Sequence, residues 1–259
     1  MSPLEITVPD MAWMLEAPLI TLLVGATLGV LLEAVAPREY RYPAQTGLAM
    51  LTVLIAMGFT VYNWVGGDFK IVAPGSIAAD KPTYFFWSLL LLVGLGGVAL
   101  FAERAVAGGV SAFAASAATV PGSPMEREAE RQRREHTEIF PLILFALFGM
   151  LLFVAANNLL TLFVALEIFS LPLYLLSGMA RRRRWLSQEA ALKYFLLGAF
   201  SSAFFLFGVA LLYGYAGTFA YAGVAQAIVA DESPWVLLLT GLVMLAVGLL
   251  FKVGAVPFH

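Results

Sequence analysis

The chain has 259 residues, of which 61% are hydrophobic and 12% charged, with a mean hydropathy of +0.88; a soluble globular protein has an apolar share of about 45–50%. It contains no cysteine, which excludes disulfides, thiolate metal sites and cysteine-bound iron–sulfur clusters. The formal net charge of −2 offers no basic face to a nucleic acid, so we expect a lipid bilayer and no nucleic acid as partner.

Seven segments are apolar over about 20 residues, the length with which a helix crosses roughly 30 Å of hydrocarbon at about 1.5 Å per residue. An open sheet edge could not satisfy its backbone in lipid, so these segments should be helices. The sequence therefore predicts an all-α, polytopic membrane helix bundle with spans at Pro18–Ala36, Ala44–Val65, Tyr84–Phe101, Ile139–Ala156, Leu159–Ala180, Ala191–Tyr213 and Trp235–Val256.

The connecting loops predict the orientation, because Lys and Arg accumulate on the cytoplasmic side of a membrane. Lys70 and Lys81 are the basic residues of the loops on one side, and the arginines all fall in the loops on the other, which places the N-terminus outside. We divide the chain into three N-terminal helices (1–104), a cytoplasmic loop (105–138) and helices four to seven (139–259). The charged run Met125–His136 should form a short solvated helix, and the outer loop Tyr215–Pro234 a partly helical surface cover.

Glu167 is the most informative ionisable residue within the spans. It lies about 12 Å from the outer end of the fifth segment, and an isolated charge at such a depth costs at least about 2.5 kcal/mol. Pro172 cannot donate a hydrogen bond to the carbonyl of Ile168, which leaves a polar point beside the carboxylate. Glu167 is thus a candidate for proton or cation transport; alternatively, a neighbouring helix satisfies it in a structural role.

Two lysines are further candidates. Lys193 follows Ser187, a plausible helix N-cap, and either acts in transport or extends its ammonium to the lipid headgroups. Its height differs from that of Glu167 by very roughly 15 Å, so coupling between them would need water or a third group. Lys252 would lie near the inner interface on a straight helix, about 26 Å from Trp235.

The end of the seventh segment changes the expectation for Lys252. Gly254 and Pro257 predict a broken helix, and broken membrane helices often place charges around a polar cavity; extension of Lys252 to the interface is the alternative. His259, with a reference pKa near 6.5, suits a proton relay or is simply exposed to solvent. A buried carboxylate and buried lysines couple their titrations, so a change in their separation can move protons without a bound cofactor.

Four stretches of the sequence together resemble the antiporter-like membrane subunits of proton-pumping NADH–quinone oxidoreductase (respiratory complex I), and specifically the subunit N branch: Glu138–Met150, Asn157–Tyr174, Ala191–Ala203 and Phe251–His259. The resemblance implies a fourteen-helix fold of two inverted repeats, of which this chain is the first part, ending before the eighth helix. It also implies a translocase subunit in a bacterial cell membrane, bound to the other membrane subunits. NADH, FMN, iron–sulfur clusters and quinone would belong to partner subunits, with no cofactor or metal in this chain.

The resemblance assigns roles by position. It implies that Glu167 is the fifth-helix glutamate and Lys252 the seventh-helix lysine of a proton channel, with Lys193 the sixth-helix lysine and His259 the histidine after a broken seventh helix. It also implies that Glu138 is an acidic residue that opens the fourth helix at the inner surface.

Three alternative functions are open. A subunit of a multi-subunit cation/proton antiporter would use the same repeat, and a non-catalytic membrane scaffold would need none of these charges. A retinal-binding pump also has seven spans and a lysine in the seventh, but its Schiff base needs a carboxylate in the third span, and Tyr84–Phe101 contains no acid.

Overall fold

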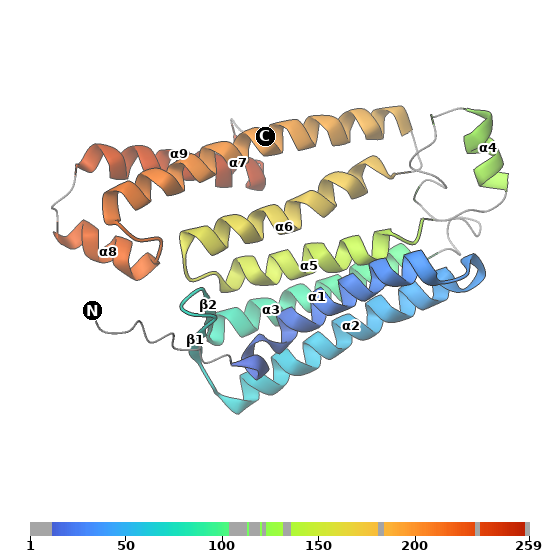
Figure 1. The fold of residues 1–259 in the computed structure, drawn as a ribbon, viewed down its shortest axis with the longest axis horizontal. Helices are drawn as coiled ribbons and strands as arrows, with labels where there is room; N and C mark the ends of the chain where they lie inside the picture. Colours follow the sequence, from blue (N-terminus) through green and yellow to red (C-terminus); the bar gives the residue numbers. More distant parts are fainter. Residues whose placement is uncertain are drawn as a thin grey trace, which may run out of the picture.

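The computed structural model describes residues 12–103, 113, 120, 123–131, 136–180, 184–230 and 234–256. In this part of the chain, long helices run roughly antiparallel to one another, with one small hairpin at one end (Figure 1). The elements are α1 (Trp13–Val35), α2 (Arg38–Gly66), β1 (Lys70–Val72), β2 (Ile77–Ala79), α3 (Lys81–Ala102), α4 (Pro124–Arg131), α5 (Ile139–Ala155), α6 (Leu159–Gly178), α7 (Arg184–Ala216), α8 (Tyr221–Ala230) and α9 (Trp235–Val253).

All seven predicted spans are helical, which confirms the all-α membrane bundle. Among the described residues, six helices are long and apolar enough to cross a membrane: α1, α2, α3, α6, α7 and α9. The remaining predicted span, α5, has 17 residues, at the short end of the range for a crossing helix. It lies between α1 and α6 in the middle of the bundle (Figure 1).

Two hydrophobic clusters hold the helices together. The first joins α1, α2, α3 and α5 around fully buried side chains such as Leu22, Val53 and Leu151, and Trp87 Nε1 donates a hydrogen bond to the Leu151 carbonyl at 2.8 Å. The second joins α6, α7 and α9 around Phe205. Outward-facing residues of the bundle are large and apolar, as expected for a surface that contacts lipid.

The start of α7 differs from the sequence-based expectation. We predicted that the sixth span begins at Ala191 with Ser187 as N-cap, but α7 begins at Arg184 and Ser187 lies inside it. Polar residues continue this helix beyond its apolar part, and two of them, Lys193 and Glu189, form an i,i+4 ion pair at 2.5 Å, which favours the helical form by a few tenths of a kcal/mol. The resulting 33 residues correspond to about 50 Å, longer than the roughly 30 Å hydrocarbon core.

The helix ends at Gly254, as predicted; a second half beyond a break would lie outside the described residues, so the break itself stays a prediction. α9 ends at Val253, three residues before the predicted boundary, and Gly254 adopts a left-handed conformation with φ of 67°. Ala255 then donates its backbone N–H to the Leu250 carbonyl at 3.0 Å, which caps the helix end. Pro257 lies outside the described residues.

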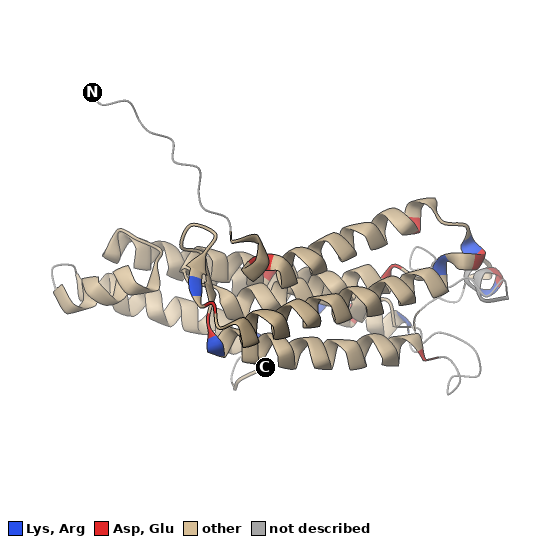
Figure 2. Ribbon diagram, turned by 90° about the horizontal axis from the view of Figure 1, so that it is seen from below, with Lys and Arg blue, Asp and Glu red and all other residues tan. Residues whose placement is uncertain are grey.

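The end of the bundle opposite the arginine-rich loops contains one feature that the sequence did not predict. The strands β1 and β2 form an antiparallel hairpin, whose Ser76 carbonyl accepts a hydrogen bond from the Asn157 N–H at 2.8 Å. Strands of three residues are too short to carry a recognisable alternation. The predicted helical character of the loop Tyr215–Pro234 is confirmed by α8, and that of the charged run by α4 as far as Arg131; residues 132–135 lie outside the described residues. Figure 2 shows that charged residues gather near the ends of the bundle; the orientation in the membrane stays a prediction.

Candidate functional site

The helix α6 carries Glu167 into the interior of the bundle. The Asn158 side chain caps its first turn by accepting the Thr161 N–H at 2.7 Å, and the helix continues through Pro172 to Gly178. The neighbouring α5 comes very close, because a Cβ on Gly149 would lie 2.5 Å from the backbone nitrogen of Phe169. Only a glycine therefore allows α6 to pack at this distance beside the segment that holds Glu167.

The Glu167 carboxylate is half-buried and has a partner on α7. The hydroxyl of Ser202 donates a short hydrogen bond to Glu167 Oε1. The adjacent Ser201 donates to the Gly248 carbonyl of α9 at 3.2 Å. Two consecutive serines of α7 thus connect it to both helices that carry the predicted charges, and a hydroxyl donor makes a charged carboxylate less costly in an apolar environment.

Lys252 lies beside the middle turns of α6. Its ammonium donates hydrogen bonds to Ser170 Oγ at 2.7 Å and to the Tyr174 hydroxyl at 2.8 Å, and both of these residues are buried, with 0% and 5% exposure. The end of α9 lies beside the middle of α7, not beside the Arg184 end of that helix (Figure 1). The early helix end at Gly254 therefore leaves Lys252 inside the bundle.

The two residues of α6 that contact Lys252 lie on the same face of that helix as Glu167. Ser170 and Tyr174 follow Glu167 by three and seven residues, spacings that place side chains on one helix face. Among the described residues, the charged atoms of Glu167 and Lys252 are not within the 4.0 Å of an ion pair. Ser170, about 4.5 Å along the helix from Glu167, lies between the two charges.

The other two predicted site residues do not join this group. The side chain of Lys193 is 68% exposed and pairs with Glu189 on its own helix. His259 lies outside the described residues. The roles implied for both stay predictions.

Sequence reasoning missed the hydroxyl groups. Ser170, Tyr174 and Ser202 are neutral, so a search for ionisable residues passes over them. Two signals could have found them: the i+3 and i+7 spacing from Glu167, and the Gly198–Ser202 pair, since small residues four apart mark close contacts between membrane helices.

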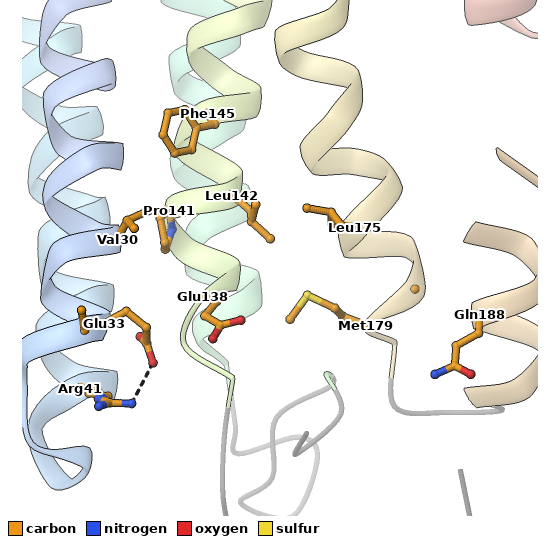
Figure 3. A pocket seen from close by; sticks show the side chains of 12 residues that line it. Val30, Glu33, Arg41, Glu138, Pro141, Leu142, Phe145, Leu175, Met179 and Gln188 are labelled. Atoms are coloured by element: carbon orange, nitrogen blue, oxygen red, sulfur yellow. Dashed lines mark hydrogen bonds and ion pairs between the residues drawn. The ribbon is translucent and has the colours of Figure 1, made fainter. Parts of the chain in front are cut away.

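A pocket of about 770 Å³ opens at the arginine-bearing end of the bundle, between α1, α5, α6 and α7 (Figure 3). Most of its lining residues are apolar, and the polar ones are Glu33, Arg41, Glu138 and Gln188. Glu138 immediately precedes α5, and its carboxylate points toward the space between α5 and α6 (Figure 3). In the part of the chain that the structure describes, no three acidic, histidine or cysteine side chains are grouped to hold a metal ion.

Glu138 Oε2 lies 3.6 Å from His136 Nδ1, and the carboxylate of Glu33 has several closer partners. It accepts hydrogen bonds from Arg41 and Gln45, both at 3.1 Å, and a short one from Thr137. This cluster fastens α1 to α2 and to the segment that leads into α5.

Comparison with known proteins places this arrangement in a class. Residues 156–259 match the family model described as NADH:quinone oxidoreductase/Mrp antiporter, TM. Together with the six candidate spans, this match defines an antiporter-like, multi-pass integral membrane protein.

The particular family follows from the relatives. The chain is 54% identical over 252 residues to NADH-quinone oxidoreductase subunit N of Nocardioides sp., covering 93% of this chain and 47% of the relative. It is 51% identical over 255 residues to the protein of the same name from Cutibacterium acnes, covering 98% and 47%. Over nearly its whole length the chain is thus similar to bacterial subunit N proteins, and it spans about half the length of these relatives.

Solved structures agree with this assignment. Respiratory complex I from Thermus thermophilus contains a chain with 31% identity and a TM-score of 0.66, which covers 93% of this chain and 45% of that one. A chain of the Mrp complex from Dietzia sp. has a TM-score of 0.67 over 96% of this chain and 42% of that one. At 20% identity, the second likeness shows the fold alone.

Proposed function

We propose that the chain is part of a membrane-arm subunit that translocates protons, driven by electron transfer from NADH to quinone in other subunits of the same complex. The observation that carries the proposal is the position of Lys252, held inside the bundle about one helical turn from Glu167. The names of the relatives, NADH-quinone oxidoreductase subunit N, support the redox partner. FMN, iron–sulfur clusters and the quinone would reside in those partner subunits.

In this proposal, Glu167 and Lys252 exchange protons with the path on either side. When the ammonium approaches the carboxylate, each charge stabilises the other. When the ammonium returns to the hydroxyls of Ser170 and Tyr174, the pair is separated and its proton affinity changes, because the two titrations are coupled. Ser202 keeps the carboxylate hydrogen-bonded in its position on α6.

Further residues extend the proposed path. Glu138 would receive protons at the inner pocket, while Lys193 and His259 would continue the relay into the part of the subunit that the relatives have in addition. The side chain of Lys193 is exposed beside Glu189 and can reach that part. The three N-terminal helices (1–104) and the loop (105–138) would support the repeat formed by residues 139–259.

The test uses the complete subunit assembled in its complex, in inverted bacterial membrane vesicles energised with NADH. Glu167→Gln and Lys252→Met each remove one charge with little change in size, and we expect loss of proton uptake while the subunit remains assembled. Glu39→Gln and Lys70→Met alter exposed residues far from the site and should pump normally. Normal pumping by Glu167→Gln would refute the assigned role.

The same vesicles distinguish the proposed function from that of a cation/proton antiporter. An antiporter would exchange protons for added Na⁺ in a pre-formed gradient, without NADH. The 20% identity to a chain of the Mrp complex shows a common fold and does not favour that activity.

A further inference from the structure

The hydroxyl of Tyr174 occupies a notch in α7 that exists because residue 198 has no side chain. A Cβ on Gly198 would lie 2.0 Å from the Tyr174 hydroxyl oxygen and 2.6 Å from the ring carbon that bears it. Carbon cannot approach oxygen so closely, and the ring itself has no freedom to retreat along α6 without leaving Lys252. Gly198 therefore determines where this hydroxyl lies.

Aromatic neighbours fix the ring of Tyr174. The ring of Tyr194 meets it edge-on with centroids 4.5 Å apart, and that of Phe195 does so at 5.8 Å. Such edge-to-face pairs restrict the orientation of a ring. With Tyr174 only 5% exposed, its hydroxyl is held in one place, directed at the Lys252 ammonium.

The hydroxyl oxygen of Ser170 is the second acceptor for the Lys252 ammonium. It donates its own proton to the Leu166 carbonyl at 2.5 Å, so its lone pairs remain to accept the hydrogen bond from Lys252. Both oxygens that receive the ammonium are thus neutral acceptors. A neutral acceptor binds an ammonium less strongly than a carboxylate does, so Lys252 can leave this position when Glu167 is ionised and within reach.

We infer that Ser170, Tyr174 and Gly198 build a lysine seat, a second resting position for the Lys252 ammonium that alternates with an ion pair to Glu167. This inference rests on the proposed function of Glu167 and Lys252 in proton translocation. The displacement required is about 4.5 Å along α6, a distance that rotation of the lysine side chain covers without movement of α9. Ser170 and Tyr174 contact the lysine directly, and Gly198 is a positioning residue that acts through the Tyr174 hydroxyl.

The experiment uses the complete subunit in its complex, in the NADH-energised vesicles described above. Tyr174→Phe removes the hydroxyl and keeps the ring, and Gly198→Ala keeps the hydroxyl but expels it from the notch. Tyr213→Phe is a matched control, since Tyr213 is half exposed and stacks on Phe219. Gly214→Ala is the other control. Gly214 lies on the same helix as Gly198, and a Cβ there would meet no heavy atom of another part of the chain within 4 Å.

We expect both seat variants to lower the number of protons pumped per NADH oxidised, while NADH oxidation and assembly remain at the level of the controls. The loss of one hydrogen bond to a charged group shifts an equilibrium by about tenfold, so the pumping ratio should fall well below that of the controls. Because both changes act on one hydroxyl, the double variant should pump no less than the more impaired single one. A cryo-EM structure of the Tyr174→Phe complex should show the ammonium at Glu167.

Other results overturn the inference. If Tyr174→Phe pumps as Tyr213→Phe does, or if oxidation and assembly fall in proportion to pumping, the seat has no role in transport. If the lysine stays on Ser170 in the variant structure, Tyr174 does not hold it. Glu167→Gln, measured in parallel, distinguishes the two proposals. Normal pumping by Glu167→Gln would refute the proposed function. Loss of pumping in Glu167→Gln together with normal pumping in Tyr174→Phe would refute the lysine seat alone.

Discussion

The contact between α7 and α9 depends on Gly208, and replacing this residue tests the packing that positions Lys252. A Cβ at Gly208 would lie 2.6 Å from the backbone nitrogen of Leu245 and 2.7 Å from the Gly241 carbonyl oxygen. Both atoms belong to the backbone of α9, so no side chain can move aside. Since ordinary contact begins at 3.4 Å, Gly208→Ala must separate the helices locally by about 0.8 Å.

The expected magnitude follows from two opposing effects. Overpacking a well-packed interface costs about 1–3 kcal/mol, whereas replacing a helical glycine by alanine contributes at most about 1 kcal/mol in its favour. Gly214→Ala, six residues further along α7, has no heavy atom within 4 Å of the new Cβ and gains only the second effect. The difference between the two variants, about 1–3 kcal/mol, therefore isolates the clash.

The assay is unfolding of the full chain in detergent micelles by added SDS, followed by circular dichroism. Gly208→Ala should unfold at a lower SDS fraction than the unaltered chain, and Gly214→Ala at the same or a higher one. If Gly208→Ala is as stable as Gly214→Ala, the close approach of α7 and α9 is not as described, and the depth of Lys252 that depends on it must be reconsidered.

Two further predictions concern residues outside the lysine seat. Thr137→Val removes a hydrogen-bond donor to the Glu33 carboxylate and should destabilise the chain by about 1.5 kcal/mol. Thr27 donates its hydroxyl to Leu23 of its own helix, so Thr27→Val should have a smaller effect in the same SDS titration. Equal losses of stability would contradict the role of the Glu33 cluster. Lys193→Met should lower proton pumping in vesicles while Glu189→Gln leaves it unchanged; equal results for both would leave Lys193 as a surface ion pair.

The sequence predicted the elements well because membrane helices are determined by local composition. About 20 consecutive apolar residues such as those after Trp235 have no other stable form in lipid, and the cost of a charge in such a run singled out Glu167 and Lys252. The hairpin and the early start of α7 were missed because neither depends on an apolar run. The hairpin has three-residue strands, and the first turns of α7 consist largely of polar residues, among them Glu189, which pairs with Lys193.

The neutral part of the site could be recognised only in three dimensions. Whether Ser170, Tyr174 and Ser202 matter depends on which helix faces them, and a sequence does not state which helices are neighbours. The same is true of Gly198, whose importance arises from a ring on another helix.

The sequence by itself determined that this chain is a bundle of membrane-spanning helices with a few costly charges, and it named Glu167 and Lys252 as the residues to explain. Only the tertiary structure decided the depth of Lys252. Helix rise counted from Trp235 places the lysine near the inner interface, but depth depends on how far α9 is shifted along α7 and where it is capped. Glycine contacts and the left-handed Gly254 fix both, and through them the ammonium reaches two hydroxyls on α6.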